Sequence, residues 1–285
     1  MAFTAAREYS DFIATQSRGD WDLLNRVYHP VADGVRLQGE LVYIDYWDPA
    51  NMTVAQAQCD TFVAGSSANL QAALTKYVGV HKECFDDARW YSVTKSDASL
   101  AQLGISAAQA LGNDLMPLIY TSIIDGAGAG QQIAVGAVPT GATILAGVYE
   151  GLVGITAVGA KRISIVMDSS YAGLFIIAAG AHFQPPQSLG LSFENSSGII
   201  GAFNGIPIYA TPTDLVDTSP SPDVNAVALI VEEFGYGYAP VGEGLGYKVV
   251  FHPDDENGTN TIIYKASFGY GVLDVAKLRV LLAQA

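Results

Sequence analysis

Hydrophobic residues recur every three or four positions between residues 96 and 123, with polar side chains on the opposite side. This spacing predicts one long helix with an apolar face. Ser96 or Asp97 can cap its amino end, and Pro117 predicts a kink or an interruption near Met116. At about 1.5 Å per residue, such a helix would be roughly 40 Å long and would form a spine for the surrounding regions. The predicted apolar face consists of Leu100, Leu103, Ala107, Leu111, Leu115 and Leu118.

A long hairpin is predicted ahead of this helix. Residues 35–47 are rich in β-branched and aromatic side chains, and Asp48-Pro49 then ends the pattern, which indicates one strand and a turn. Residues 50–69 are small and polar, and residues 70–85 again have the composition of a strand. Ordinary hairpin loops have about two to five residues. A connection this long indicates either a functional projection, ordered in some proteins by a partner, or a mobile surface loop.

The region after the helix predicts an α/β layer. Residues 141–160 form an apolar run of membrane-span length, but Glu150 at its centre and five glycines favour a buried helix over residues 142–155. Residues 161–167 predict a central strand, and Asp168 is placed to cap a second helix that continues through Ile177. Helix, strand and helix in this order are typical of an α/β layer. The inward side chains of the first helix are predicted to be Ile144, Val148, Leu152 and Ile155.

Strands dominate the second half of the sequence. Residues 199–210 predict two short strands around a turn at Asn204-Gly205, a dipeptide favoured in tight hairpins. Further strands are predicted at residues 226–233, 247–252, 261–268 and 271–275, the last leading into 277–282.

Two glycine-rich segments, residues 125–130 and 242–246, superficially resemble phosphate-binding loops. A dinucleotide-binding loop follows a strand and opens a helix, whereas the first segment follows the predicted spine helix. Neither segment is completed by Lys-Ser or Lys-Thr, so we predict turns at both. The sequence has no Gly-x-Ser-x-Gly nucleophile motif. We therefore assign no catalytic and no cofactor-binding residues.

Composition narrows the possible functions. The chain has 285 residues with 28 acidic and 14 basic side chains, for a formal charge of −14. This balance is opposite to the basic surface with which proteins hold phosphates, so direct nucleic-acid binding is not expected. An acidic surface either keeps the protein soluble or forms a wall that lies near nucleic acid without adhering to it.

The cysteines and histidines indicate a reducing compartment and no metal site. Two cysteines, Cys59 and Cys84, in a chain of this length are expected to be free thiols. The four histidines lie far apart and have no ligand-like spacing. The first nine residues have no apolar signal-peptide region, so we expect synthesis and folding in a cytoplasm.

The order of the elements resembles the tailed-phage major capsid proteins of the Hong Kong 97-like fold. The strand pair at residues 200–209, Ile-Gly-Ala-Phe-Asn-Gly-Ile-Pro-Ile-Tyr, and the segment 268–274, Phe-Gly-Tyr-Gly-Val-Leu-Asp, contribute to this resemblance. It spans nearly the whole chain and rests on the order and spacing of the elements. The resemblance implies an α+β fold with an N-terminal arm, an E-loop hairpin, a peripheral P-domain with a spine helix, and an axial A-domain. The implied ranges are 1–35 for the arm, 36–84 for the E-loop, 85–139 for the P-domain with strand 266–285 returning to it, and 140–265 for the A-domain.

The resemblance also implies a structural function. Copies would assemble as hexamers and pentamers into an icosahedral head shell around double-stranded phage DNA, without enzymatic activity, cofactors, metal sites or membrane contact. The protein would be part of the virion, assembled in the cytoplasm of the bacterial host. Some family members fuse a scaffolding segment ahead of the arm, and there is no room for one before Val35, so we expect a separate scaffolding protein. A portal protein and, in some shells, a decoration protein are further implied partners.

One family property is not carried over to this chain. Some members crosslink an E-loop lysine to a neighbouring asparagine. Lys76 and Lys82 are E-loop lysines by position only, and nothing in the sequence identifies a crosslinking pair.

Two alternative functions remain open at this stage. The same fold could form an encapsulin-like compartment around a cargo enzyme. A different class, an acidic cytoplasmic α/β hydrolytic enzyme, would form a small oligomer with a deep polar pocket. A shell protein, by contrast, would form particles of megadalton mass.

Overall fold

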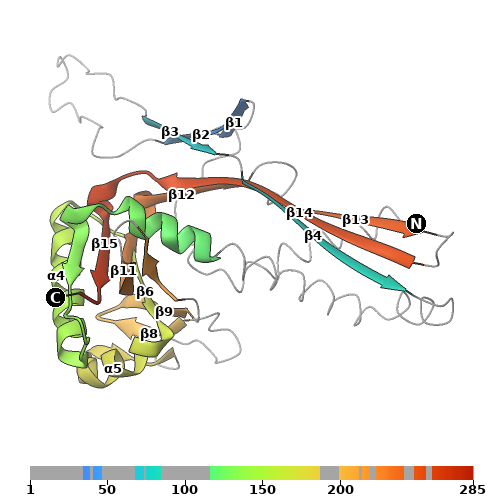
Figure 1. The fold of residues 1–285 in the computed structure, drawn as a ribbon. Helices are drawn as coiled ribbons and strands as arrows, with labels where there is room; N and C mark the ends of the chain where they lie inside the picture. The colour runs from blue at the N-terminus through green and yellow to red at the C-terminus, as the bar shows by residue number, and fades with distance from the viewer. Residues whose placement is uncertain are drawn as a thin grey trace, which may run out of the picture.

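The strands of the described part of the chain form three sheets, which Figure 1 shows together with the helices that cover the largest of them. The computed structural model describes residues 35–38, 41–46, 68–73, 75–84, 116–186, 199–211, 214–218, 223–240, 247–254 and 259–284. The predicted arm before residue 35 and the first part of the predicted spine helix, residues 96–115, lie outside the described residues.

The largest sheet has eight strands in the order β5-β15-β11-β6-β9-β8-β7, with β10 beside β11. The pairs β15–β5 and β6–β9 are parallel, and the other pairs are antiparallel. The strands are β5 (Gln132–Ala134), β6 (Ile163–Asp168), β7 (Phe183–Gln184), β8 (Ile199–Phe203), β9 (Ile206–Thr211), β10 (Val216–Asp217), β11 (Val224–Glu232) and β15 (Leu278–Leu282).

Two helices, α4 (Gly141–Ala157) and α5 (Ser169–Ala179), cover one face of this central sheet. Asp168 caps α5, because its carboxylate accepts a hydrogen bond from the Ser170 backbone N–H at 2.8 Å. The predicted central strand and both predicted helices are therefore confirmed. In the described residues, no helix has the length and apolar character of a membrane span. The four α4 side chains predicted to point inward are all buried: Ile144, Val148, Leu152 and Ile155.

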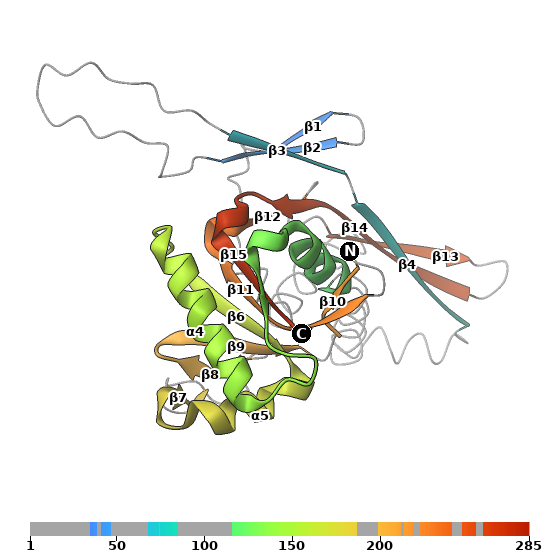
Figure 2. The same cartoon turned by 60° about the vertical axis from the view of Figure 1, so that its left-hand side comes forward.

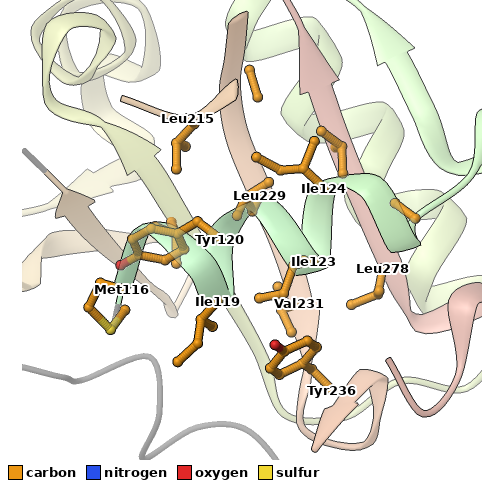
Figure 3. Close-up of a cluster of buried hydrophobic side chains, with 14 of the residues drawn as sticks. Met116, Ile119, Tyr120, Ile123, Ile124, Leu215, Leu229, Val231, Tyr236 and Leu278 are labelled. Carbon is orange, nitrogen blue, oxygen red and sulfur yellow. The ribbon is translucent and has the colours of Figure 1, made fainter. Parts of the chain in front are cut away.

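The opposite face of the sheet is covered by a helix over residues 116–126 (Figure 2). Strand β11 serves both layers: Leu229 and Val231 pack with this helix, whereas Val227 and Ile230 pack with α4 and α5. The result is a three-layer arrangement with the sheet in the middle. Figure 3 shows the side chains of the helix directed at the sheet. The buried side of this segment consists of Met116, Ile119, Tyr120, Ile123, Ile124 and Ala127.

The prediction that the helix continues through Ile123 is confirmed, but the predicted apolar face is wrong at its end. Leu118 is 39% exposed, whereas Ile119 and Ile123 are fully buried. Successive residues of a helix are separated by about 100°, so a face that contains position 119 turns position 118 away from the sheet. The earlier leucines of the predicted face lie outside the described residues.

The single strand predicted at residues 35–47 is wrong, because this segment forms two antiparallel strands, β1 (Val35–Gln38) and β2 (Leu41–Tyr46). Gln38 pairs with Leu41, so only two residues connect the strands. Gly39 is one of them, and glycine is a preferred residue of two-residue hairpin connections. The residues on both sides of the glycine have the composition of a strand, so the sequence pattern did not show that the chain reverses direction there.

The strands predicted at residues 261–268 and 271–275 are instead one strand, β14 (Thr259–Val272). Gly269 and Gly271 do not interrupt it, because they pair with Ala239 and Gly237 of the neighbouring strand β12 (Tyr236–Pro240). The C-terminal strand is β15, which starts at Leu278.

Both testable turn predictions are confirmed. Asn204 and Gly205 connect β8 and β9 with φ values of 50° and 84°, the left-handed conformation that a tight hairpin turn requires. Gly128 has a φ of 67° and precedes the 3₁₀ turn η3 (Ala129–Gln131), so the first glycine-rich segment is a turn after a helix. The second segment, residues 242–246, lies outside the described residues.

Candidate assembly surfaces

A long antiparallel sheet extends away from the three-layer body (Figure 1). It consists of β12, β13 (Tyr247–Asp254), β14 and β4 (Thr75–Cys84). The fourteen residues of β14 span about 45 Å at about 3.3 Å per residue. Strand β4 pairs with β14 from Thr75 opposite Phe268 to Cys84 opposite Thr259. Residues 247–254 and 259–265, predicted to belong to the A-domain, thus share a sheet with the last strand of the predicted E-loop.

The third sheet contains the two strands of the predicted hairpin. Strand β2 pairs with β3 (Ala68–Ala73), and the pairing starts with Tyr46 opposite Ala68. The long hairpin is therefore confirmed for β2 and β3, and its connection, residues 47–67, lies outside the described residues. The second strand predicted at residues 70–85 is wrong as a single strand, because its larger part is β4, which pairs with β14 in the long sheet. Strands of four to six residues in a three-stranded sheet bury little surface by themselves. One residue separates β3 from β4, so the chain passes directly from this small sheet into the long one.

The long sheet is joined to the body by two adjacent crossings of the chain. Strand β11 continues through the 3₁₀ turn η7 (Glu233–Gly235) into β12, and β14 continues through η8 (Val275–Lys277) into β15. The two crossings are bonded to each other, because the Leu273 and Asp274 N–H groups donate to the Gly235 carbonyl at 3.0 and 3.4 Å. Gly235 must be small here, because an added Cβ would lie 2.8 Å from the Leu278 side chain.

A buried lysine connects the same two turns. Lys277 of η8 is only 7% exposed, and its ammonium lies 3.7 Å from an Asp274 carboxylate oxygen and 5.5 Å from the centre of the Phe234 ring. A buried charge with both an anionic and an aromatic partner is satisfied electrostatically. At the start of β12, directly after η7, burial raises the pKa of the Tyr236 hydroxyl far above its usual range, so this side chain stays neutral. The junction is well placed to fix the direction of the long sheet.

Sequence analysis did not identify this junction. Asp274 and Lys277 are three residues apart, a spacing common on any exposed turn, and Phe234 lies some forty residues earlier in the chain. Only the pairing of β12 with β14 brings the three side chains together.

The described residues contain no cluster of metal-ligating side chains. No group of three or more His, Cys, Asp or Glu side chains in this part of the chain could hold a metal ion. Lys76 and Lys82 both lie on β4, opposite Ser267 and Thr261 of β14. Cys84 is the last residue of β4, and Cys59 lies outside the described residues.

Comparisons with known proteins agree on the architecture. No family model and no curated protein matches the sequence. Among solved structures, the capsid of Ralstonia phage GP4 matches with a TM-score of 0.60 and 12% identity, over 91% of this chain and 87% of that chain. The SrpI encapsulin of Synechococcus elongatus PCC 7942 matches with a TM-score of 0.58 and 14% identity, over 92% and 86% of the two chains. The capsid of cyanophage P-SCSP1u gives 0.54 and 11%, over 90% and 86%.

Each of these matches extends over nine-tenths or more of the chain, so none is confined to the three-layer body. At such low identity they establish the arrangement of the chain and not its activity. The chain has the α+β Hong Kong 97-like fold, shared by tailed-phage capsid proteins and encapsulins.

Proposed function

We propose that this chain is the major capsid protein of a tailed phage, and that copies of it self-assemble into the icosahedral head shell around double-stranded DNA. The observation that supports this most strongly is the extent of the fold match. It extends over nine-tenths or more of the chain, and most of the matched structures named above are phage capsids.

The shape of the subunit supports the same conclusion in physical terms. The three-stranded sheet of β1, β2 and β3 and the long sheet that extends from the three-layer body are separate sheets of three and four strands, and small sheets bury little surface by themselves. Such elements gain burial when they lie on neighbouring copies, and that gain offsets the entropy lost in ordering them. The formal charge of −14 suits a container wall that faces DNA without adhering to it.

The remaining parts of the proposal follow from this function. We expect no enzymatic activity, location in the virion, assembly in the host bacterial cytoplasm, and a portal, a scaffolding protein and, in some shells, a decoration protein as partners. The ranges 1–35, 36–84, 85–139 with 266–285, and 140–265 stay our proposal for the arm, E-loop, P-domain and A-domain.

An encapsulin-like compartment is the second candidate, favoured by the match to the SrpI encapsulin. Both candidates predict closed shells, but their contents differ. A phage head encloses DNA and is encoded beside a terminase and a portal. A compartment encloses a protein cargo, and its gene lies beside that cargo.

Negative-stain electron microscopy of the purified chain, combined with nuclease-protection and mass-spectrometric analysis of the particle contents, tests the proposal. We expect closed particles of megadalton mass, with protected DNA when they are isolated from infected cells. Particles that contain a second protein and no DNA would favour the compartment. A monodisperse oligomer of a few subunits would overturn both shell functions.

A further inference from the structure

All the lysines of the long sheet belong to one of its two faces. Successive residues of a strand belong to opposite faces, and residues paired directly across two strands belong to the same face. The pairing of β14 with β4 and β13 runs from residue to residue without interruption, and every lysine in it stands at, or opposite, an odd-numbered position of β14. We call this side the lysine face. The pairs that define it are Lys248–Lys265, Lys82–Thr261 and Lys76–Ser267.

The opposite side of the long sheet continues into the core of the body. Phe268 is 1% exposed and belongs to the same buried cluster as the helix over residues 116–126, and Tyr270 packs against this cluster. Both are even-numbered positions of β14, so the lysine face is the side of the sheet away from the helix. The remaining Tyr and Phe residues of β4, β13 and β14 also belong to the even side, and they are Tyr77, Tyr247, Phe251 and Tyr264.

The lysine face combines positive charge with an apolar centre. Val80, Ile263 and Val250 form one row across the three strands, and each of the two neighbouring rows contains lysine. Asp254 at the end of β13 is the only Asp or Glu that these strands place on this face. An apolar centre within a polar rim is the usual composition of a protein interface.

One pair on the lysine face is unfavourable for the isolated sheet. Lys248 and Lys265 are directly opposite in an antiparallel pair, where Cβ atoms lie about 4.5–5.5 Å apart and like charges destabilise the pairing. The other strand partner of Lys265 is Val78, so no acidic residue is paired with it. A carboxylate supplied by another molecule would offset this cost.

We infer that the lysine face is the docking site of an acidic partner protein, which binds through a segment with apolar residues flanked by Asp or Glu. The inference rests on the proposed function and adds one partner contact to it. Contacts between copies in the shell would then use other parts of the long sheet. In both overall views the small sheet lies beside the β12 end of the long sheet, and β13 extends beyond it (Figures 1 and 2).

Composition favours a partner protein over nucleic acid and over a second copy. A duplex backbone offers phosphates but no apolar surface for the central row, and the lysine face has no Tyr, Phe or Trp on which bases could stack. No helix or strand among the described residues contains more than one Asp or Glu. The described parts of a second copy therefore offer no acidic stripe that matches this face.

Binding of a designed peptide tests the inference. The probe is a fluorescent peptide of alternating Val and Glu, added to the unassembled full-length chain and followed by anisotropy. We expect binding that Lys265→Glu and Ile263→Thr each weaken about ten-fold or more. Lys161→Glu is the matched control, because Lys161 is exposed between α4 and β6 and the change in charge is the same. Distant exposed charges are screened by salt, so the control should bind within about two-fold of the unmodified chain.

The outcomes separate the inference from its alternatives. Absence of peptide binding by the unmodified chain, or an equal loss from Lys161→Glu and Lys265→Glu, would overturn it. Tighter binding of duplex DNA than of the peptide, lost in Lys265→Glu, would assign the face to nucleic acid instead. If Lys265→Glu lowers the thermal midpoint of the chain, Lys265→Gln takes its place, and a peptide affinity unchanged by that variant would contradict the inference.

Lysine acetylation distinguishes a partner protein from a second copy. Acetylation of Lys248 and Lys265 by N-hydroxysuccinimide acetate is measured by mass spectrometry in particles of this chain alone and in unassembled subunits. We expect rates within about two-fold of each other, whereas protection of about ten-fold or more in the particles would assign the face to a neighbouring copy and overturn the inference. Absence of particles from the unmodified protein would overturn the shell function itself, independently of the peptide result.

Discussion

Truncation of Ile123 to Ala is the sharpest test of how the helix over residues 116–126 packs. Ile123 is fully buried in the cluster between this helix and the central sheet, near Val231 and Leu278 (Figure 3). Leu118, on the same helix, is 39% exposed. The two truncations remove the same number of carbon atoms, so a difference in their effects reports the face of the helix rather than the chemistry of the change.

The expected magnitudes follow from burial. Removing three buried carbons from Ile123 loses roughly 2.5 kcal/mol of transfer free energy at about 0.8 kcal/mol per group. The cavity left behind adds to this, for a total cost of about 3 to 5 kcal/mol. Leu118→Ala leaves no closed cavity and removes a side chain that is partly in water, so it should cost about 1.5 kcal/mol or less. The cost expected for Ile123→Ala is a considerable part of the free energy of unfolding of a typical domain, which is about 5 to 15 kcal/mol.

Urea denaturation of the unassembled full-length chain, followed by circular dichroism, measures both variants. The midpoint should fall clearly for Ile123→Ala and only slightly for Leu118→Ala, with similar slopes for both transitions. Equal destabilisation by the two changes, or a greater effect at Leu118, would mean that the helix faces the sheet with the side predicted from the sequence and that the packing described above is wrong.

Three further predictions concern other parts of the chain. The Asp168 carboxylate caps α5 by accepting a hydrogen bond from the Ser170 N–H, so Asp168→Ala should lower the unfolding free energy by about 1 kcal/mol. Asp168→Asn should retain most of the capping stability, and equal losses for the two variants in urea denaturation would contradict a capping role. Replacing residues 51–66 by a short Gly-Ser linker leaves β2 and β3 in place and should preserve the thermal transition but abolish particles in gel filtration; loss of the transition would mean that the segment belongs to the core. Cys59→Ser with Cys84→Ser should leave assembly unchanged, and a native disulfide in mass spectrometry after alkylation would contradict this.

Local signals in the sequence were sufficient for much of the three-layer body. The apolar spacing of α4 fixed its buried face, Asp168 marked the start of α5, and Asn204-Gly205 marked the turn between β8 and β9. Each of these features depends on residues within a few positions of one another, so the sequence records it directly.

Features that depend on distant parts of the chain were missed. The pairing of β4 with β14 joins residues almost two hundred positions apart, and no local pattern specifies it. The junction around Lys277 depends in turn on the pairing of β12 with β14. The error at Leu118 was avoidable, because Met116, Ile119, Tyr120, Ile123 and Ile124 already follow the three-and-four spacing of a buried face. The predicted face instead extended the spacing of the earlier leucines beyond Pro117 to Leu118.

Single-particle cryo-electron microscopy of the assembled protein would test the central claim most directly. We expect a closed icosahedral shell in which the long sheet and the β2–β3 hairpin of each copy lie on neighbouring copies, with the three-layer body arranged around the symmetry axes. A small discrete oligomer, or a particle in which the hairpin folds back onto the central sheet of its own subunit, would contradict it.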